Sequence, residues 1–299
     1  MIYKGRRIDV SLYIMLIPAL VLVAIFSYGP LFGLVIAFKD YDIALGIMKS
    51  KWVGLENFRY VFLEPQFASV IWNTIGIAFA KLVANFVVPI IVSLMLNELM
   101  NERYKKFIQT AVYLPHFLSW VVISGVMISI LSPTDGIVNG VMKNLGLNSM
   151  YFLGDKNLFP ATMVVSDVWK GFGYSTILYM AALTGIDPSL YEAASIDRAN
   201  RFQKIWYITL PGIVPIMVLA GTLSMGRLLN AGFDQIFNLY SPTVYSTGDI
   251  LDTWIYRKGI KEAQFDVATA VGLIKSVVSL GLVSGSYYLA YKFADYRIF

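Results

Sequence analysis

The chain has 299 residues, of which 57% are hydrophobic and only 14% are charged, and its mean hydropathy is +0.64. Soluble domains carry about 25% charged residues, so this composition indicates that lipid is the solvent for much of the chain. The net charge of +5 fits basic cytoplasmic loops and requires no nucleic-acid partner. The chain has no cysteine and one histidine, His116, which excludes disulfides, thiolate metal sites and histidine-rich metal sites.

Six segments are long and apolar enough to be spanning helices, which need about 20 predominantly apolar residues. The expected fold class is therefore an all-α, polytopic membrane protein with six transmembrane helices, in a single transmembrane domain comprising residues 1–299. The segments run from Ser11 to Phe38, Ser69 to Leu96, Ile108 to Leu131, Phe159 to Thr184, Ile208 to Leu229 and Val267 to Tyr291.

The first segment follows a charged start with Lys4, Arg6 and Arg7. No small-residue cleavage site follows its apolar run, so we expect a signal anchor rather than a cleaved signal peptide. Pro18 and Pro30 lie within it and are expected to kink or locally break the helix.

The distribution of Lys and Arg predicts the orientation, because cytoplasmic loops collect positive charge. With a cytoplasmic amino terminus, the inner segments are those near residues 1–10, 97–107, 185–207 and 292–299. These segments hold 11 Lys and Arg, against nine in the longer outer loops, a density more than twice as high. Both termini are therefore expected to be cytoplasmic, as an even number of spans requires.

The motifs of common enzymes are absent from the sequence. No stretch reads G-x-x-x-x-G-K-[ST], so the chain has no P-loop for ATP. The lone His116 lies at the boundary of a predicted span, and no close carboxylate pair lies in a candidate pocket, which disfavours triad and glycosidase chemistry. We therefore expect no catalytic residues and no metal bound by this chain.

The loop between the fourth and fifth predicted spans, about residues 185–207, has a distinct local pattern. Asp187 is a good N-cap and Pro188 suits the first helical position, so a short helix is expected to begin here. Ala193 and Ala194 give this helix a small face that another surface can approach closely. Such a helix is suited to docking in a groove of a partner protein.

Glu192-Ala193-Ala194, followed by Ile208-Thr209-Leu210-Pro211, resembles the EAA loop in the permease subunits of binding-protein-dependent ABC importers. The family pattern is EAA, three residues, a glycine, nine residues and I-x-LP. Every element of this pattern is present in register over residues 192–211, except that Arg198 occupies the position of the glycine.

This resemblance implies a MetI-like ABC importer permease fold, an all-α bundle whose halves have an inverted relation. It implies that the loop forms a coupling helix that inserts into a cleft of a cytoplasmic ATPase subunit. The residues assigned to coupling are Glu192, Ala193, Ala194, Asp197 and Arg198. The alternative is an interfacial helix that only caps two spans.

The resemblance also implies the partners of the chain. They are a second homologous permease, two cytoplasmic ATPase subunits, an extracellular solute-binding lipoprotein and the lipid bilayer of a bacterial cell membrane. ATP and Mg would be bound by the ATPase subunits, and no cofactor by this chain.

Other segments resemble sugar-importer permeases in particular. These are Trp52–Phe58, which reads WVGLENF, and Tyr113-Leu114-Pro115. The outer stretch from Phe233 to Gly259 is similar to the LplB-like branch, which imports complex oligosaccharides. The implied substrate is an oligosaccharide.

Ionisable residues within predicted spans are costly in lipid, so they are expected to face the protein interior or water. They are Lys81, Asp167, Lys170, Arg227 and Lys275. Asp167 and Lys170 are three residues apart, share a helix face and are predicted to pair.

The candidate substrate path lies on the fourth predicted span and at the outer end of the fifth. A sugar has apolar ring faces and a polar rim, which aromatic platforms and hydrogen-bonding groups would suit. The candidates are Asp167, Trp169, Lys170, Tyr174, Asn230 and Asp234. Trp169 lies off the stripe shared by Asp167, Lys170 and Tyr174 and is expected to face lipid or the partner permease. The alternatives are a structural ion pair with an aromatic belt, and, for Asn230 and Asp234, loop contacts with the binding protein.

The resulting hypothesis is the permease subunit of an ATP-driven oligosaccharide importer. A permease of the same fold for another solute is the first alternative. A stand-alone secondary transporter is the second, but it would leave the EAA-like loop without a role and has only Asp167 as an acidic group in its spans.

Overall fold

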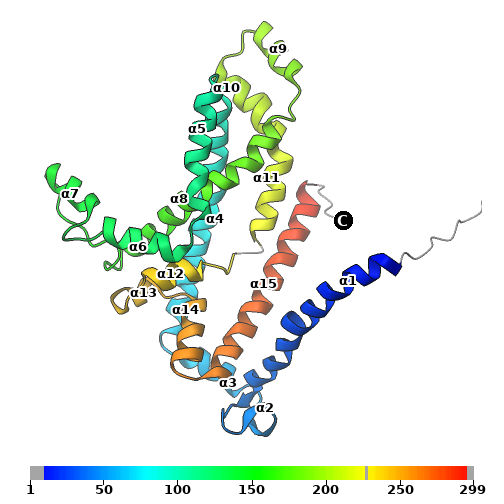
Figure 1. Ribbon diagram of the computed structural model, residues 1–299, viewed down its shortest axis with the longest axis vertical. Helices are drawn as coiled ribbons and strands as arrows, with labels where there is room; N and C mark the ends of the chain where they lie inside the picture. Colours follow the sequence, from blue (N-terminus) through cyan, green and yellow to red (C-terminus); the bar gives the residue numbers. More distant parts are fainter. Residues whose placement is uncertain (1–9, 226–227, 295–299) are drawn as a thin grey trace, which may run out of the picture. The chain divides into compact units, whose positions relative to one another are not determined.

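The structure is a computed structural model that describes residues 10–225 and 228–294. The predicted all-α class is confirmed for this part of the chain, where helices are joined by turns and one two-stranded hairpin (Figure 1). The chain divides into two compact units. The first comprises Met1–Leu63 with Ile255–Ile274, and the second comprises Glu64–Trp254 with Lys275–Phe299.

The first predicted span lies in the first unit and changes helix type along its length. Helix α1 (Val10–Val23) contains Pro18 and continues as a π-helical turn over Ala24–Tyr28. A 3₁₀ helix (Gly29–Phe38) follows, with Pro30 in its first turn, where a missing N–H leaves no helical bond unmade. The helical stretch Tyr13–Phe38 is continuous: it changes type just before Pro30 without ending there, and α1 continues through Pro18.

The rest of the first unit follows this span. Strands β1 (Lys39–Asp40) and β2 (Lys51–Trp52) pair antiparallel, with Lys39 opposite Trp52, and enclose the short helix α2 (Gly46–Lys49). Helix α3 (Glu56–Leu63), a π-helical turn (Arg257–Lys261) and the start of α15 (Phe265–Ala294) complete it.

The WVGLENF segment has a structural role in this unit. The Asn57 side chain donates to the carbonyl oxygens of Ala37 (3.0 Å) and Lys39 (2.8 Å), where the 3₁₀ helix ends and β1 begins. The Phe38 ring stacks on Trp52, with 5.7 Å between ring centroids. The segment that resembles sugar-importer permeases therefore holds the end of the first span against the hairpin.

In the second unit, the long helices α4 (Phe67–Asn97) and α8 (Leu158–Leu183) pack along one another, and α11 (Leu210–Met225) packs on α8. Shorter helices join them. They are α5 (Glu102–Tyr113), α6 (Trp120–Ile130), α7 (Ile137–Asn144), α9 (Pro188–Ile196), α10 (Arg201–Lys204), α12 (Phe233–Leu239), α13 (Tyr245–Gly248) and α14 (Leu251–Tyr256).

The third predicted span is bent rather than continuous. A 3₁₀ turn (Leu114–Phe117) follows α5, and the helices on either side of the break make an angle of 104°. Ser119 caps the new helix by accepting a hydrogen bond from the Val122 N–H at 3.3 Å. Pro115 within the turn has no N–H to continue the α-helical ladder, which is the physical reason for the break.

Four helical stretches in the described residues are long and apolar enough to cross a membrane, or five if the bent pair is one span. They are Tyr13–Phe38, Phe67–Asn97, Arg201–Met225 and Phe265–Tyr288. Helix α8 has 26 residues, but it contains Asp167, Lys170 and other polar groups and is not among these stretches. Six spans therefore stay a prediction, with α8 and the bent pair as the two remaining members.

Different helices lie near the two ends of α8. Around its amino-terminal end, Phe159 and Met163 are fully buried against Ile236, Val244 and Ile250, in the region of α12 and α13. Beyond its carboxyl-terminal end, α9 and α10 lie at the top of Figure 1. The EAA-like loop thus follows the carboxyl-terminal end of α8, whereas α12 and α13 lie near its amino-terminal end.

Candidate functional site

A cavity of about 430 Å³ lies between α4, α8, the end of α11, the bend after α5 and the segment just before α12. Its volume is within the range of small-ligand pockets, about 300–1,000 Å³. We call it the polar cavity, because charged, amide, hydroxyl and imidazole groups converge on it from these separate segments. Its polar and aromatic lining residues are Lys81, Asn85, His116, Trp120, Asp167, Lys170, Ser175, Ser224 and Asn230.

Lys81 is the most deeply buried charge of the polar cavity, with only 6% of its surface exposed. Its ammonium donates to the Ala231 carbonyl oxygen at 2.7 Å and to Gln235 Oε1, and lies 3.5 Å from Asp167 Oδ1. Gln235 in turn donates to the Met163 carbonyl oxygen at 2.8 Å. All three N–H groups of the ammonium have a partner, so a buried network joins α4, α8 and α12.

Two side chains of α4 contact the two carboxylate oxygens of Asp167. Asn85 donates to Oδ2 at 2.8 Å, while Lys81 lies near Oδ1. The predicted pair between Asp167 and Lys170 is wrong. Lys81 reaches Asp167 from the facing helix, and the Lys170 ammonium instead donates to the His116 carbonyl oxygen at 2.8 Å.

Lys170 and Tyr174 of α8 both contact the bend between α5 and α6. The Lys170 ammonium lies 5.7 Å from the centroid of the Trp120 ring, a cation–π arrangement. The Tyr174 ring stacks on His116, with 4.1 Å between centroids and 4° between planes. Tyr174 therefore does not line the polar cavity itself but packs on a residue that does.

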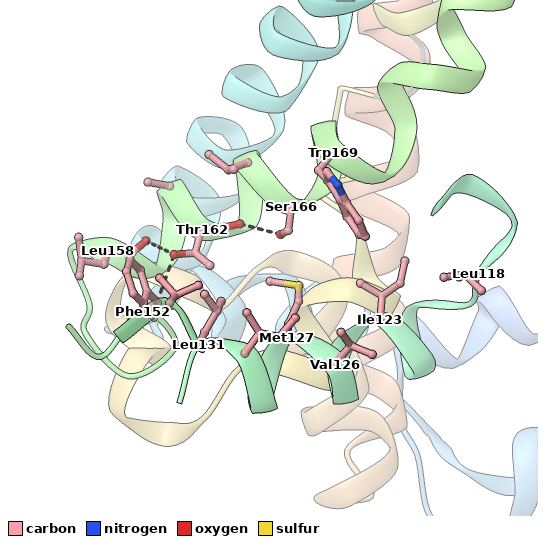
Figure 2. A pocket seen from close by; sticks show the side chains of 14 residues that line it. Leu118, Ile123, Val126, Met127, Leu131, Phe152, Leu158, Thr162, Ser166 and Trp169 are labelled. Carbon is pink, nitrogen blue, oxygen red and sulfur yellow. Dashed lines mark hydrogen bonds between the residues drawn. The ribbon is translucent and has the colours of Figure 1, made fainter. Parts of the chain in front are cut away.

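The other residues predicted for the substrate path lie in different places in the structure. Asn230 lines the polar cavity, whereas Asp234 is exposed on α12 and is not among the lining residues. Trp169 lines a second cavity, about 630 Å³ in volume, between α6 and α8. Figure 2 shows its ring on the side of this apolar cavity nearest to Ile123. Arg227 lies outside the described residues.

Four polar or aromatic residues of the cavity were not predicted from the sequence, which placed His116 only at the boundary of a span. They are Asn85, Trp120, Ser175 and Ser224. One signal could have found Asn85. It lies one helical turn from Lys81 in an otherwise apolar segment, so both polar side chains share a face of α4. The position of Trp120 depends on the bend, which has no such periodic signal.

The short helix predicted in the EAA-like loop is present as α9. The Asp187 carboxylate accepts a hydrogen bond from the Ser189 N–H at 2.9 Å, which confirms the predicted N-cap. This backbone hydrogen bond holds the pKa of Asp187 below its ordinary value. Glu192, Ala193 and Ile196 are exposed on the helix, and Ile196 has 82% of its surface accessible.

Arg198 forms the turn that the family motif makes with glycine. Its φ is +57°, in the left-handed region that glycine adopts without a steric penalty. The Ala199 N–H donates to the Ala194 carbonyl oxygen at 2.9 Å, and the Arg198 N–H donates to the Ser195 carbonyl oxygen at 3.1 Å. These two bonds are those of a Schellman C-cap. The turn after α9 is therefore retained, at a steric cost of about 1 kcal/mol for the arginine backbone.

The remaining contacts attach α9 to the next spanning helix. Lys204 of α10 donates to Ser195 Oγ at 2.7 Å, and the Tyr191 hydroxyl lies 2.9 Å from Thr209 Oγ1, just before α11. Helix α10 begins with a reciprocal capping box of Asn200 and Gln203. The loop is thus a hydrogen-bonded structure, in which Glu192 and Ala193 remain exposed.

Comparisons with known proteins agree over nearly the whole chain. The family of binding-protein-dependent transport system inner membrane components matches residues 85–280. Protein LplB of Bacillus subtilis (strain 168) is 39% identical over 291 residues, which cover 97% of this chain and 92% of LplB. The polygalacturonan/rhamnogalacturonan transport system permease protein YteP of the same strain is 39% identical over 288 residues, or 96% of this chain and 90% of YteP.

Two solved structures share the fold. One is a bacterial ABC transporter involved in the import of the acidic polysaccharide alginate, with a TM-score of 0.89, 38% identity and coverage of 95% of this chain and 96% of the other. The second is a bacterial alginate ABC transporter in complex with alginate pentasaccharide-bound periplasmic protein, with the same TM-score and identity and 97% coverage of both chains. The EAA-like loop, the helical fold and these matches lead to one conclusion: the chain belongs to the family of binding-protein-dependent ABC transporter permeases.

Proposed function

We propose that this chain is a channel-forming subunit of an ATP-driven importer, and that the polar cavity is part of the path of an oligosaccharide. The observation that carries the proposal is the convergence of Asp167, Lys170, Asn85 and Asn230 on one cavity between long apolar helices. The relatives named for polysaccharide transport support an oligosaccharide as the substrate. Amide and charged groups would bind sugar hydroxyls, and the Trp120 ring would pack against an apolar sugar face.

The proposed partners follow from the family and from α9. They are a second homologous permease, two cytoplasmic ATPase subunits that bind ATP and Mg, and an extracellular solute-binding protein. The exposed Glu192 and Ala193, with the half-buried Ala194, form the surface that would dock in an ATPase cleft. Helix α8 carries Asp167 and Lys170 and leads through a short turn into α9, so a displacement of α9 has a short route to the polar cavity. We propose that ATP hydrolysis resides in the partner subunits and that this chain binds no cofactor.

We expect both termini and α9 to be cytoplasmic, because Lys and Arg are more than twice as dense in those segments. A reporter that is active only in the cytoplasm should be active when fused after residue 297. It should be silent when inserted within residues 144–148, which lie before the opposite end of α8. The reversed pattern would place α9 outside and contradict the coupling role.

Filling the polar cavity should stop import without preventing membrane insertion. In Ser175→Trp an indole occupies the space beside Asp167 and Lys170, and Ser175 itself makes no hydrogen bond of the buried network. In proteoliposomes containing the complete transporter, we expect oligosaccharide uptake to fall more than about tenfold, while basal ATP hydrolysis remains.

Ser175→Ala is the matched control and should transport normally, since it removes only a hydroxyl. Normal uptake by a correctly inserted Ser175→Trp variant would show that the substrate does not pass through the polar cavity.

A further inference from the structure

The described lining of the polar cavity holds more positive than negative charge. Its lysine and carboxylate groups are Lys81, Lys170 and Asp167. Lys81 and Asp167 are 3.5 Å apart and balance one another. The ammonium of Lys170 is the remaining charge, and its partner must come from another source.

Lys170 has unused hydrogen-bonding capacity. Its ammonium has three N–H groups, and one of them donates to the His116 carbonyl oxygen at 2.8 Å. The Trp120 ring lies 5.7 Å away and attracts the cation without accepting a conventional hydrogen bond. Within residues 10–225 and 228–294, no carboxylate lies within 4.0 Å of this ammonium. Lys170 can therefore donate to a ligand in the cavity without breaking a bond inside the protein.

A surplus charge of this kind suits some sugars better than others. A cation without a counter-ion is costly between spanning helices, so a position of this kind indicates a functional partner. Sugar hydroxyls need only neutral groups, and Asn85 and Asn230 supply these in the same cavity. A carboxylate, by contrast, forms a charge-assisted hydrogen bond with an ammonium, about twice as strong as a neutral one.

We propose that the imported oligosaccharide bears carboxylate groups, as uronic acid units do, and that the Lys170 ammonium binds one of these carboxylates in the polar cavity. This inference rests on the proposed function, because it assumes that the substrate passes through this cavity. The bond from Lys170 to His116 would meanwhile keep the ammonium in place over Trp120.

The test uses two matched series of probes with the complete transporter in proteoliposomes. One series is linear oligogalacturonate and oligomannuronate. The other is the same oligosaccharides with each carboxylate reduced to a primary alcohol, which leaves the linkage and the ring unchanged. We expect import of the acidic series, and a fall of about tenfold in its maximal rate in Lys170→Gln. Lys170→Arg, which retains the charge, should remain within about twofold of the original rate.

A second variant distinguishes the loss of the positive charge from a defect in folding. The chain has no cysteine, so Lys170→Cys introduces a unique thiol in this subunit. An aminoethyl methanethiosulfonate forms a mixed disulfide with that thiol, releases methanesulfinate and restores a positive charge. This reagent should recover import of the acidic series, whereas the neutral methyl reagent should not.

Each contrary outcome has a distinct meaning. Import of the reduced series alone, or unchanged acidic import in Lys170→Gln, would overturn the inference while the permease function stands. Equal recovery with both thiol reagents would show that bulk rather than charge matters at residue 170, and would overturn it as well. Import of neither series would overturn the proposed oligosaccharide function together with the inference.

Discussion

Replacing Lys81 by methionine is expected to destabilise the permease by about 3 kcal/mol, since breaking a buried pair leaves an uncompensated charge. Asp167 would lose its cation, and Gln235 Oε1 and the Ala231 carbonyl would lose a donor in a buried site. The network joins three helices, so the loss should appear as a lower melting temperature of the detergent-solubilised complex and less protein in the membrane.

Removing both charges should be less harmful than removing one. In the double variant Lys81→Met/Asp167→Asn the unpaired carboxylate is gone, so we expect part of the stability to return. Lys143→Met, at an exposed lysine, is the control for loss of a positive charge and should be close to neutral. If Lys81→Met melts at the same temperature as Lys143→Met, the buried network does not stabilise the fold.

Ala193→Trp is expected to separate ATP hydrolysis from import. Ala193 is exposed on α9, where a small side chain lets a partner surface approach the helix backbone. An indole at this position would hold the ATPase away from α9. Uptake should fall by more than about tenfold, as for the loss of an interface hot spot, and substrate should no longer stimulate ATP hydrolysis.

Ala193→Ser is the matched control, because it changes the volume little and retains the helix; its coupling should be near normal. Membrane abundance of the permease must be equal in both variants. Substrate-stimulated hydrolysis and uptake at normal levels in Ala193→Trp would remove this face of α9 from the ATPase contact and favour a helix that only caps two spans.

Features with a local cause were predictable from the sequence. The apolar excess indicated lipid as the solvent, and the change of helix type next to Pro30 has a local cause, because proline fits the first turn of a new helical segment. The start of α9 follows from Asp187 and Pro188, which satisfy its first turn by themselves. The family resemblance of the EAA-like loop, now confirmed, also depends on a local pattern, since the residues that carry it lie between 192 and 211.

The turn at Arg198 is an intermediate case. The spacing of the motif located the turn, but arginine at the glycine position left its geometry open. The structure has the left-handed φ and both Schellman hydrogen bonds, so the loop imposes the backbone conformation on a residue that does not favour it. The bonds to α9, together with the contacts of α10, outweigh the local preference of one residue.

The partners of the charged residues were decided only by tertiary structure. Helical periodicity places Asp167 and Lys170 on one face of α8, and on that ground alone a pair between them was reasonable. The packing of α4 brings Lys81 to Asp167, and the 104° bend after α5 brings the His116 carbonyl to Lys170. Periodicity determines which direction a side chain takes from its own helix, but the group it meets depends on segments distant in the chain, and their packing leaves Lys170 as the unbalanced charge of the polar cavity.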